Sequence, residues 1–420
     1  MAQFLLLIGP TYLIALALLL NWAYGWFDSF LPFTRNLHFR YISGMIFTVF
    51  ALLMPAAFFL AAGRVQMFFR RVGYMTVVVV IYLSMFVFAA TVVLWIVQRV
   101  IGHFHPDRIY CEVTDSNGMV KRTKRPLWGP WTYRILGTLI IGGVMNVAVY
   151  GQHHARDIQV HRYETTVGKS GGNIDRMKVV LIGDLHLGYN AGPELMEQMV
   201  TKINAENPDI VFVAGDIFDN QWSAVREPER TEEILAGIKA KYGVYGVMGN
   251  HDVEDNLIFG FNFSAGRTNL TDSRYLEFCE KAGIKILSDE VVTIDDSVYI
   301  VGRLDREETG NESQTRLSSA ELIEKLDKSK TIIDLEHEPA DVETLAAEGY
   351  DFLMAGHTHA GQYFPITLGM DLIWYNAWGY RTCDNLQTYV TSGVGCFGPY
   401  FRTLTDSEIM VIDIYFKEKQ

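Results

Sequence analysis

The chain has 420 residues and a formal net charge of −12, and 49% of its residues are hydrophobic. Residues 1–150 contain 12 Lys and Arg against 4 Asp and Glu, a net charge of +8, so the remainder carries −20. This length allows two or three domains, and a basic, apolar front followed by an acidic back indicates two different parts. Nucleic-acid binding requires a basic surface, so the acidic part is not expected to have a nucleic-acid partner.

Four apolar stretches in the front part are long enough, or nearly so, to cross ~30 Å of hydrocarbon, which takes about 20 residues. They are Phe4–Trp26, Tyr41–Gly63, Val72–Val97 and Ile135–Gly151. None of them has a charged residue or a histidine in its interior, whereas transporters and proton relays need such groups within the membrane. The sequence therefore predicts an all-α, multi-pass membrane anchor over residues 1–151, with the polar stretch Gly102–Arg125 outside the bilayer.

The distribution of basic residues bears on the orientation of this anchor. Four spans would place the second loop and residues 152–420 on the same side of the membrane. Arg64, Arg70 and Arg71 in the second loop favour the cytoplasm for that side. The opposite loops hold a larger basic set, made up of Arg35, Arg40, the Lys121–Arg125 cluster and Arg134. We therefore expect residues 152–420 to lie outside the cytoplasm, attached to the cell membrane.

Residues 152–420 alternate strand-like and helix-like segments, which indicates an α/β domain. The predicted strands include Asp157–Val167 at a sheet edge, Ile210–Ala214, Val244–Met248 and Thr331–Asp334. The predicted helices are Pro193–Asn204, Thr231–Lys241, Ser273–Ala282, Ser318–Lys325 and Ala340–Ala347.

Three further features of this part leave alternatives open. The aperiodic segment Asn256–Asn269 is either a loop packed on the core or a flap that contacts an apolar substrate. The aromatic segment Asp371–Arg381 is predicted to be core rather than lipid contact. The four cysteines lack Cys-x-x-Cys spacing and predict neither a zinc site nor a disulfide framework; Cys383 and Cys396 either pair or are small buried side chains.

Five strand-like runs each end in residues of metal-ligand type. These residues are Asp184 and His186, Asp216 and Asp219, Asn250-His251-Asp252, His337, and His357 with His359. Functional groups in open α/β sheets gather beyond the carboxyl ends of the strands, so we expect these side chains to meet. Carboxylate and imidazole ligands suit Mn, Fe or Zn. The repeated pattern therefore predicts a dinuclear metal site.

In this order, the same residues resemble the motifs of the calcineurin-like metallophosphoesterases. The resemblance covers about Met177–Ile414, and the segments GHTHAGQ (356–362) and GVGCFGPYFR (393–402) are similar to a bacterial, membrane-linked branch of the family. It implies that residues 152–420 form a four-layer α/β sandwich, in which two mixed β-sheets are flanked by helices. The resemblance thus predicts a calcineurin-like phosphoesterase domain that follows an all-α transmembrane region in the sequence.

The resemblance also implies roles for single residues. Asp184, His186, Asp216 and His359 would bind one divalent ion, and Asp216, Asn250, His337 and His357 the other, with Asp216 bridging. A hydroxide held by both ions would attack the phosphoryl group. His251, hydrogen-bonded to Asp219, would protonate the leaving group; the alternative is a further ligand or a turn residue. Arg402 would contact the substrate phosphate, or else is simply solvated.

Two departures from the protein Ser/Thr phosphatases bear on the substrate. Those enzymes carry an Arg where this chain has Asn220 and another where it has Met248. Without that pair to neutralise a dianionic monoester, a phosphodiester or a pyrophosphate is the better expectation, on a lipid-linked or envelope precursor. The alternative function is a membrane sensor or scaffold that has lost turnover, which the complete ligand set with His251 and Asp219 disfavours.

Overall fold

The computed structural model describes residues 35–417 apart from 58–59, 61–62, 115–118, 125–126, 254–272 and 307–315, together with residues 18, 21, 25 and 28. The chain divides into two compact units. The helical unit comprises residues 1–59 and 68–150, and the α/β unit comprises 60–67 and 151–420. The segment Asn256–Asn269 and nearly all of the predicted span Phe4–Trp26 lie outside the described residues.

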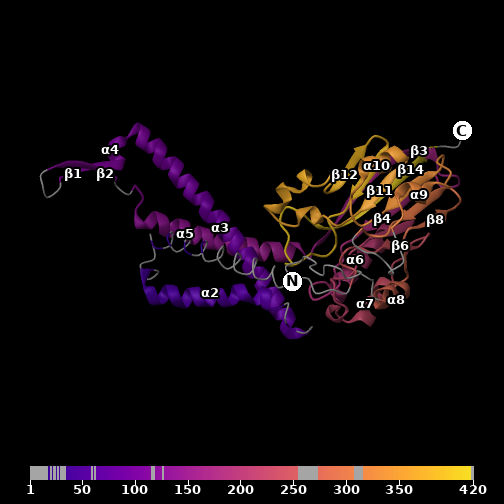
Figure 1. Ribbon diagram of the computed structural model, residues 1–420, viewed down its shortest axis with the longest axis horizontal. Helices are drawn as coiled ribbons and strands as arrows, with labels where there is room; N and C mark the ends of the chain where they lie inside the picture. The colour runs from indigo at the N-terminus through magenta and orange to yellow at the C-terminus, as the bar shows by residue number, and fades with distance from the viewer. Residues whose placement is uncertain are drawn as a thin grey trace. The chain divides into compact units, whose positions relative to one another are not determined.

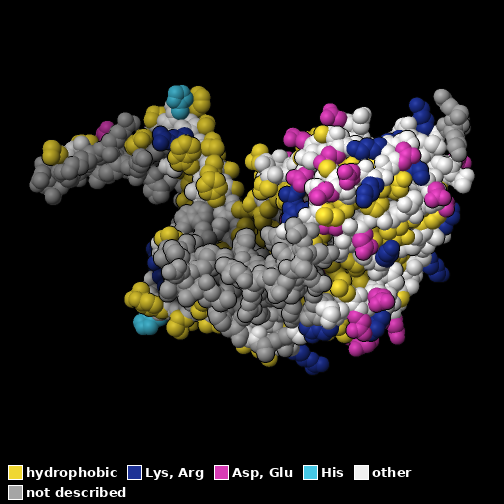
Figure 2. Space-filling view, turned by 45° about the vertical axis from the view of Figure 1, so that its right-hand side comes forward, with side chains coloured by type: hydrophobic (Ala, Val, Ile, Leu, Met, Phe, Trp, Pro, Cys, Tyr) yellow, Lys and Arg dark blue, Asp and Glu magenta, His cyan; other side chains and the backbone are white. Residues whose placement is uncertain are grey.

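Within its described residues, the helical unit contains three long helices, α2 (Leu37–Ala57), α3 (Arg64–Phe104) and α5 (Pro130–His154). In the part of the chain that the structure describes, two helices are long and apolar enough to cross a membrane: Arg64–Phe104, with a mean hydropathy of 2.8 in its most apolar window, and Trp131–His154, with 1.5. The predicted polar stretch forms the short helix α4 (Pro106–Ile109) and a hairpin of β1 (Tyr110–Thr114) and β2 (Val120–Lys124). Figure 2 shows many hydrophobic side chains among the described residues of the helical unit, whereas acidic and basic side chains are interspersed over the α/β unit.

The α/β unit is built on two six-stranded mixed sheets (Figure 1). In order across the first sheet, the strands are β3 (Ile158–Ser170), β14 (Ser407–Lys417), β4 (Arg176–Ile182), β5 (Ile210–Ala214), β6 (Val244–Val247) and β7 (Ile284–Ile286). Across the second sheet they are β12 (Gly379–Cys383), β13 (Leu386–Val390), β11 (Phe352–Ala355), β10 (Thr331–Leu335), β9 (Val298–Gly302) and β8 (Glu290–Ile294). The neighbours β4, β5 and β6 are parallel, as are β9, β10 and β11.

Alternation along the strands produces the layers, because successive side chains of a strand point to opposite faces. On β4, Val179 and Leu181 join the core between the two sheets, whereas Val180 and Ile182 face the helical side. The outer layers contain α6 (Pro193–Glu206), α7 (Pro228–Leu235) and α8 (Ser273–Lys281) on one side and α9 (Ser319–Ile323) and α10 (Val342–Glu348) on the other (Figure 1). The predicted four-layer sandwich of two mixed sheets flanked by helices is confirmed.

Local signals explain most helix boundaries. Pro193 occupies the first turn of α6, where its missing N–H costs no hydrogen bond. Ser318 and Glu321 form a capping box at the start of α9. Helix α7 was expected over Thr231–Lys241 but begins at Pro228 and ends at Leu235, because a proline also suits its first turn and Gly237 follows its end.

One expectation about the C-terminal part is wrong. In Asp371–Arg381, predicted to be core, Leu372 is 89% exposed and Ile373 is 72% exposed. This segment leaves the sheet after β11 and returns only at β12, an edge strand. Of the two alternatives for Cys383 and Cys396, the structure has the unpaired one, since both are free thiols.

Candidate metal centre

The predicted ligands lie just beyond the carboxyl ends of five strands from both sheets. Asp184 follows β4, Asp216 follows β5, Asn250 follows β6, His337 follows β10 and His357 follows β11. Because β4–β6 and β9–β11 are parallel sets, the residues that follow each set leave at the same edge of its sheet. The structure thus brings predicted ligands that lie between positions 184 and 359 of the sequence together beyond the carboxyl ends of these strands.

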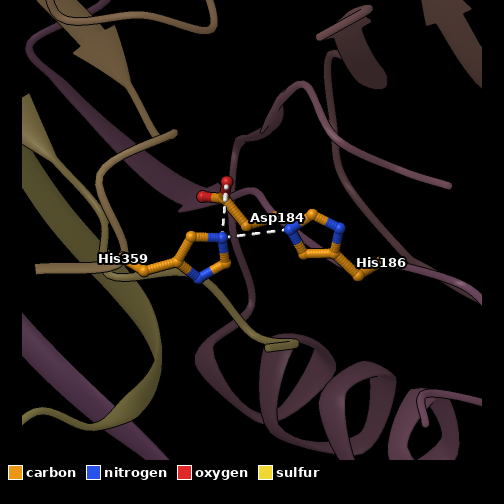
Figure 3. A group of neighbouring side chains, drawn as sticks. All are labelled: Asp184, His186 and His359. Atoms are coloured by element: carbon orange, nitrogen blue, oxygen red, sulfur yellow. Dashed lines mark hydrogen bonds and ion pairs between the residues drawn. The ribbon is translucent and has the colours of Figure 1, made fainter. Parts of the chain in front are cut away.

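The first group consists of Asp184, His186 and His359 (Figure 3). The two imidazole Nε2 atoms are 3.0 Å apart, and His359 Nε2 lies 3.5 Å from Asp184 Oδ1. All three residues are buried, with at most 7% of their surface exposed. Two ring nitrogens and a carboxylate oxygen therefore converge on one point out of bulk water.

The second group consists of Asp216, His337 and His357. His337 Nε2 lies 3.2 Å from Asp216 Oδ2 and 3.0 Å from His357 Nδ1. The side-chain oxygen of Asn250 joins this group, at 3.0 Å from His337 Nε2 and 3.2 Å from His357 Nδ1.

Asp216 lies between the two groups. Its Oδ2 atom is 3.2 Å from His337 Nε2 in the second group and 3.8 Å from His186 Nε2 in the first. Its Oδ1 atom accepts a hydrogen bond of 2.9 Å from the backbone N–H of His251. A single carboxylate is thus held where a ligand shared by two ions would have to be.

The backbone at this centre adopts a conformation that side chains disfavour. Asp184, His186, Asp216, His357 and His359 have φ between 46° and 72°, in the left-handed region that few non-glycine residues occupy. Residues held there cluster at functional sites, where the surrounding structure stabilises them. Here the Asp184 N–H donates to Gly215 O at 2.9 Å and the His186 N–H donates to Asp216 O at 3.0 Å.

Hydrogen bonds around the ligands fix their orientation. His337 Nδ1 donates to the carbonyl oxygen of Ala214 at 2.8 Å, which leaves Nε2 directed at the Asp216 group as the atom free to bind a metal. The Asp184 carboxylate accepts from the backbone N–H of His357 at 3.1 Å. The loop after β11 of the second sheet therefore orients Asp184, which follows β4 of the first sheet.

Burial and charge shift the pKa values of these groups. Burial raises the pKa of Asp184 to about 7, and it lowers the pKa of His186 to about 4 and that of His357 to about 3. Burial also opposes the charged forms of Asp216 and His337, but their attraction prevails. The pKa of Asp216 lies well below its usual value and that of His337 well above. Without a metal, the Asp216–His337 pair is therefore charged, and His186 and His357 are neutral.

The residues present fit divalent cations. Carboxylates, imidazoles and an amide oxygen are ligands of Mn, Fe and Zn, and the ligand atoms in each group lie within 4.8 Å of one another. His186 Nδ1 is a buried atom with no hydrogen-bond partner among the described residues, and in the first group Nε2 faces Nε2, a contact in which one hydrogen atom at most is shared. A cation in place of that hydrogen atom would satisfy both Nε2 atoms.

His251 has a different hydrogen-bond partner from the one expected. Its Nδ1 atom contacts the side-chain oxygen of Asn220, and the Asn220 side-chain N–H donates to Val253 O at 3.4 Å. An amide oxygen only accepts, so His251 carries its proton on Nδ1. Asp219 lies nearby, in a group with His186 and His251 whose ligand atoms are within 4.8 Å. Asn220 directly follows Asp219 in the sequence, and no local pattern predicts its contact with His251.

Arg402 does not have the position expected of a phosphate contact. Its side chain is fully buried, and Nη2 donates to the backbone oxygens of Ser392 at 2.6 Å and Gly395 at 2.8 Å. Nη1 lies 3.4 Å from the backbone oxygen of His359. A guanidinium that contacts substrate must be accessible, so here Arg402 instead holds the C-terminal loop against the loop that carries His359.

Comparisons with known proteins agree with this geometry. Residues 177–361 match the family model of the calcineurin-like phosphoesterases. An uncharacterized metallophosphoesterase of Campylobacter jejuni is 25% identical over 58% of this chain and 60% of its own length. A transmembrane protein with a metallophosphoesterase domain from Danio rerio is 30% identical over 64% of this chain and 60% of its own length. The chain thus spans about three fifths of these two relatives. A Bacillus subtilis metallophosphoesterase is 26% identical over 66% of this chain and 92% of its own length.

Proposed function

Because residues 177–361 match the family model of the calcineurin-like phosphoesterases, we propose that this chain is a membrane-anchored phosphohydrolase that cleaves a phosphodiester or pyrophosphate bond. The observation that carries the proposal is the position of Asp216. One carboxylate lies between two groups of carboxylate and imidazole ligand atoms, in which every residue except His357 is buried. Two cooperating metal ions require such a shared ligand. The cofactors are two divalent ions, drawn from Mn, Fe and Zn.

The ligands divide as the geometry groups them. Asp184, His186 and His359 hold one ion, His337, His357 and Asn250 hold the other, and Asp216 serves both. Two divalent ions bound there would supply Lewis-acid activation of the phosphoryl group and would lower the pKa of a bound water towards neutrality.

His251 is the group that donates a proton to the departing oxygen. Asn220 keeps the Nδ1 proton in place, so Nε2 is the atom available for proton transfer to substrate. Asp219, in the same group of atoms, supplies the negative charge that a protonated imidazole needs nearby. The ring of Phe397, at 5.0 Å from the His251 ring between centroids, covers one side of His251 and limits access of water.

The positions of Asn220 and Met248 support a diester or pyrophosphate substrate. Both side chains are buried, and neither carries charge. A dianionic monoester needs more positive charge than a monoanionic diester, and these two positions do not supply it. Arg402 does not replace them, because backbone oxygens already occupy its guanidinium group.

The membrane anchor is proposed from the helical unit. Arg64–Phe104 and Trp131–His154 are candidate spans, within a region of about four spans over residues 1–151. Residues 60–67 belong to the α/β unit, where Tyr189 Oη accepts from the Gly63 N–H at 3.0 Å and contacts Gln66. These contacts support a topology that puts the loop before α3 and the phosphoesterase domain on one side, which we place outside the cytoplasm.

The test is hydrolysis by the purified full chain, depleted of metal and then supplied with Mn. We expect turnover of bis-p-nitrophenyl phosphate or of a nucleoside diphosphate sugar to exceed that of p-nitrophenyl phosphate. His251→Ala should keep its metals and lose on the order of 10²–10⁴ in rate with a poor alkyl leaving group, and less with nitrophenol, which needs no proton. His153→Ala, at an exposed histidine outside the centre, is the matched control.

Three results would contradict the proposal. A preference for the monoester would remove the diester assignment, and equal losses with both leaving groups would remove His251 from the acid role. Two bound metals without hydrolysis of any of the three substrates would instead support a sensor or scaffold.

A further inference from the structure

The metal centre is bordered by an exposed group of aliphatic side chains. This group, the apolar lip, consists of Ile366, Leu368, Leu372, Ile373 and Leu404. Four of its members are 70% to 89% exposed, whereas no other large apolar side chain among the described residues 151–417 exceeds 47%. Single exposed apolar residues are ordinary on protein surfaces, but four exposed aliphatic side chains within residues 366–373 are typical of an interaction site.

The lip is continuous with the loop that carries two of the proposed ligands. It begins just after His359, in the short 3-10 helices η4 (Ile366–Leu368) and η5 (Met370–Leu372). After the lip, the chain returns to the metal centre at Trp374 and Ala377. The Trp374 ring lies 5.3 Å from the His357 ring between centroids, and the carbonyl oxygen of Ala377 accepts a hydrogen bond from Thr358 Oγ1 at 2.5 Å. Whatever covers the lip is therefore held beside the metal ligands.

The fifth member of the lip comes from the C-terminal loop. Thr403 N–H donates to Gln362 O at 3.2 Å, and Phe364 N–H donates to Thr403 Oγ1 at 3.1 Å. These bonds align Leu404 with the start of the lip. Leu404 has a φ of 63°, a conformation that leucine disfavours, and yet its side chain is 76% exposed. No internal packing explains why a leucine is held outward there.

The charge and the chain connectivity of the lip point to lipid rather than to a soluble partner. The acidic residue beside the lip, Asp371, pairs with Arg381 at 3.5 Å, so this pair adds no net charge to the aliphatic surface.

The α/β unit is also joined directly to both candidate spans. Residues 64–67 of α3 belong to it, and β3 begins only three residues, Ala155 to Asp157, after α5 ends at His154. If these helices span a bilayer, the unit is tethered at its surface.

We propose that the apolar lip inserts into the bilayer surface and presents phosphoester headgroups of lipids to the metal centre. A shallow insertion of aliphatic side chains into the boundary between headgroups and acyl chains is the usual mode of interfacial binding. The proposal rests on the phosphohydrolase function for its substrate, which is a lipid phosphodiester or pyrophosphate. The insertion itself does not depend on turnover and is measured separately.

Insertion is tested with the full chain reconstituted in phosphatidylcholine–phosphatidylglycerol vesicles. In a background with Cys111 and Cys383 changed to Ser, Leu372→Cys is labelled with an environment-sensitive fluorophore. The matched control is Leu276→Cys, at a 44% exposed leucine of α8. Nitroxide-labelled lipids should quench the label at 372 and leave the label at 276 unquenched. Equal quenching at both positions, or no quenching at 372, would overturn the proposal. A label at 372 that is shielded from water but not quenched by the lipids would mean that protein covers the lip.

Substrate selection is tested with Leu372→Glu/Ile373→Glu and the control Leu276→Glu. We expect hydrolysis of phosphatidyl-p-nitrophenol in vesicles to fall at least roughly tenfold, the factor that burial of one leucine side chain represents, with hydrolysis of soluble bis-p-nitrophenyl phosphate unchanged. Equal loss on both substrates would overturn the role of the lip. If the unmodified chain hydrolyses neither substrate, the phosphohydrolase function fails, while the quenching result still decides insertion.

Discussion

Replacement of Gly249 by Ala tests whether the position of Asp216 controls the centre. A Cβ atom built on Gly249 would lie 2.3 Å from Asp216 Oδ1, 2.6 Å from the Asp216 backbone nitrogen and 2.8 Å from His337 Cδ2. Each distance is about 1 Å shorter than an ordinary contact. The backbone of Asp216 cannot retreat freely, because its carbonyl oxygen accepts from the His186 N–H at 3.0 Å.

The expected consequence is local. Overpacking of this kind costs about 1–3 kcal/mol of stability, which leaves the domain folded, whereas a displacement of about 1 Å at a reacting centre costs on the order of 10² in rate. Metal analysis and diester hydrolysis by the full chain are the assays, with thermal unfolding to monitor the fold. Gly168→Ala is the control, since its Cβ would meet no atom within 4 Å. Normal metal content together with normal turnover in Gly249→Ala would refute the reasoning.

Three other predictions follow from the same structure. Asp216→Asn should hold well under half of the normal metal, measured by elemental analysis, because both groups lose a charged ligand; two retained ions would exclude a shared role. Zinc binding to the metal-free full chain at pH 6 should release about two protons, one from Asp184 with its pKa of about 7 and one from His337 with its raised pKa. His186 and His357, with pKa values of about 4 and 3, are already neutral at pH 6 and release no proton on binding zinc. Calorimetry in buffers of different ionisation enthalpy measures the number of protons released. A release near zero or near four protons would contradict the prediction. A C-terminal alkaline phosphatase fusion should be active and a green fluorescent protein fusion dark, and the reverse pair would place the domain in the cytoplasm.

The pH dependence of metal binding follows from the signs of these shifts. The raised pKa values of Asp184 and His337 mean that metal and protons compete for both groups. The affinity for metal should begin to fall as the pH drops through the raised pKa of His337, and should fall more steeply below about pH 7, where Asp184 also binds a proton. The lowered pKa values of His186 and His357 delay their protonation to below about pH 4. Loss of metal between pH 7 and pH 5 is therefore attributable to Asp184 and His337.

Local sequence was sufficient for the main strands and for the grouping of the candidate ligands, whereas the two facing sheets were implied by the resemblance to the family. Continuous apolar runs rich in β-branched residues predict β4 and β5, because buried parallel strands need apolar side chains on both faces. Five runs that end in Asp, Asn or His predict one common site, since parallel strands end together. These features repeat along the chain, and each can be recognised within about ten residues.

The features that the sequence did not determine depend on contacts between distant segments. Asn220 rather than Asp219 meets His251 Nδ1 because the loops after β5 and β6 lie side by side. Arg402 is buried because backbone oxygens of the 392–395 loop surround its guanidinium, a setting that its neighbours in sequence do not reveal. Leu372 and Ile373 are exposed although their side chains are strongly apolar, because the segment between β11 and β12 lies beyond the edge of the sheet. Composition fixes which side chains favour burial, and only the tertiary structure decides which of them find a layer to cover them.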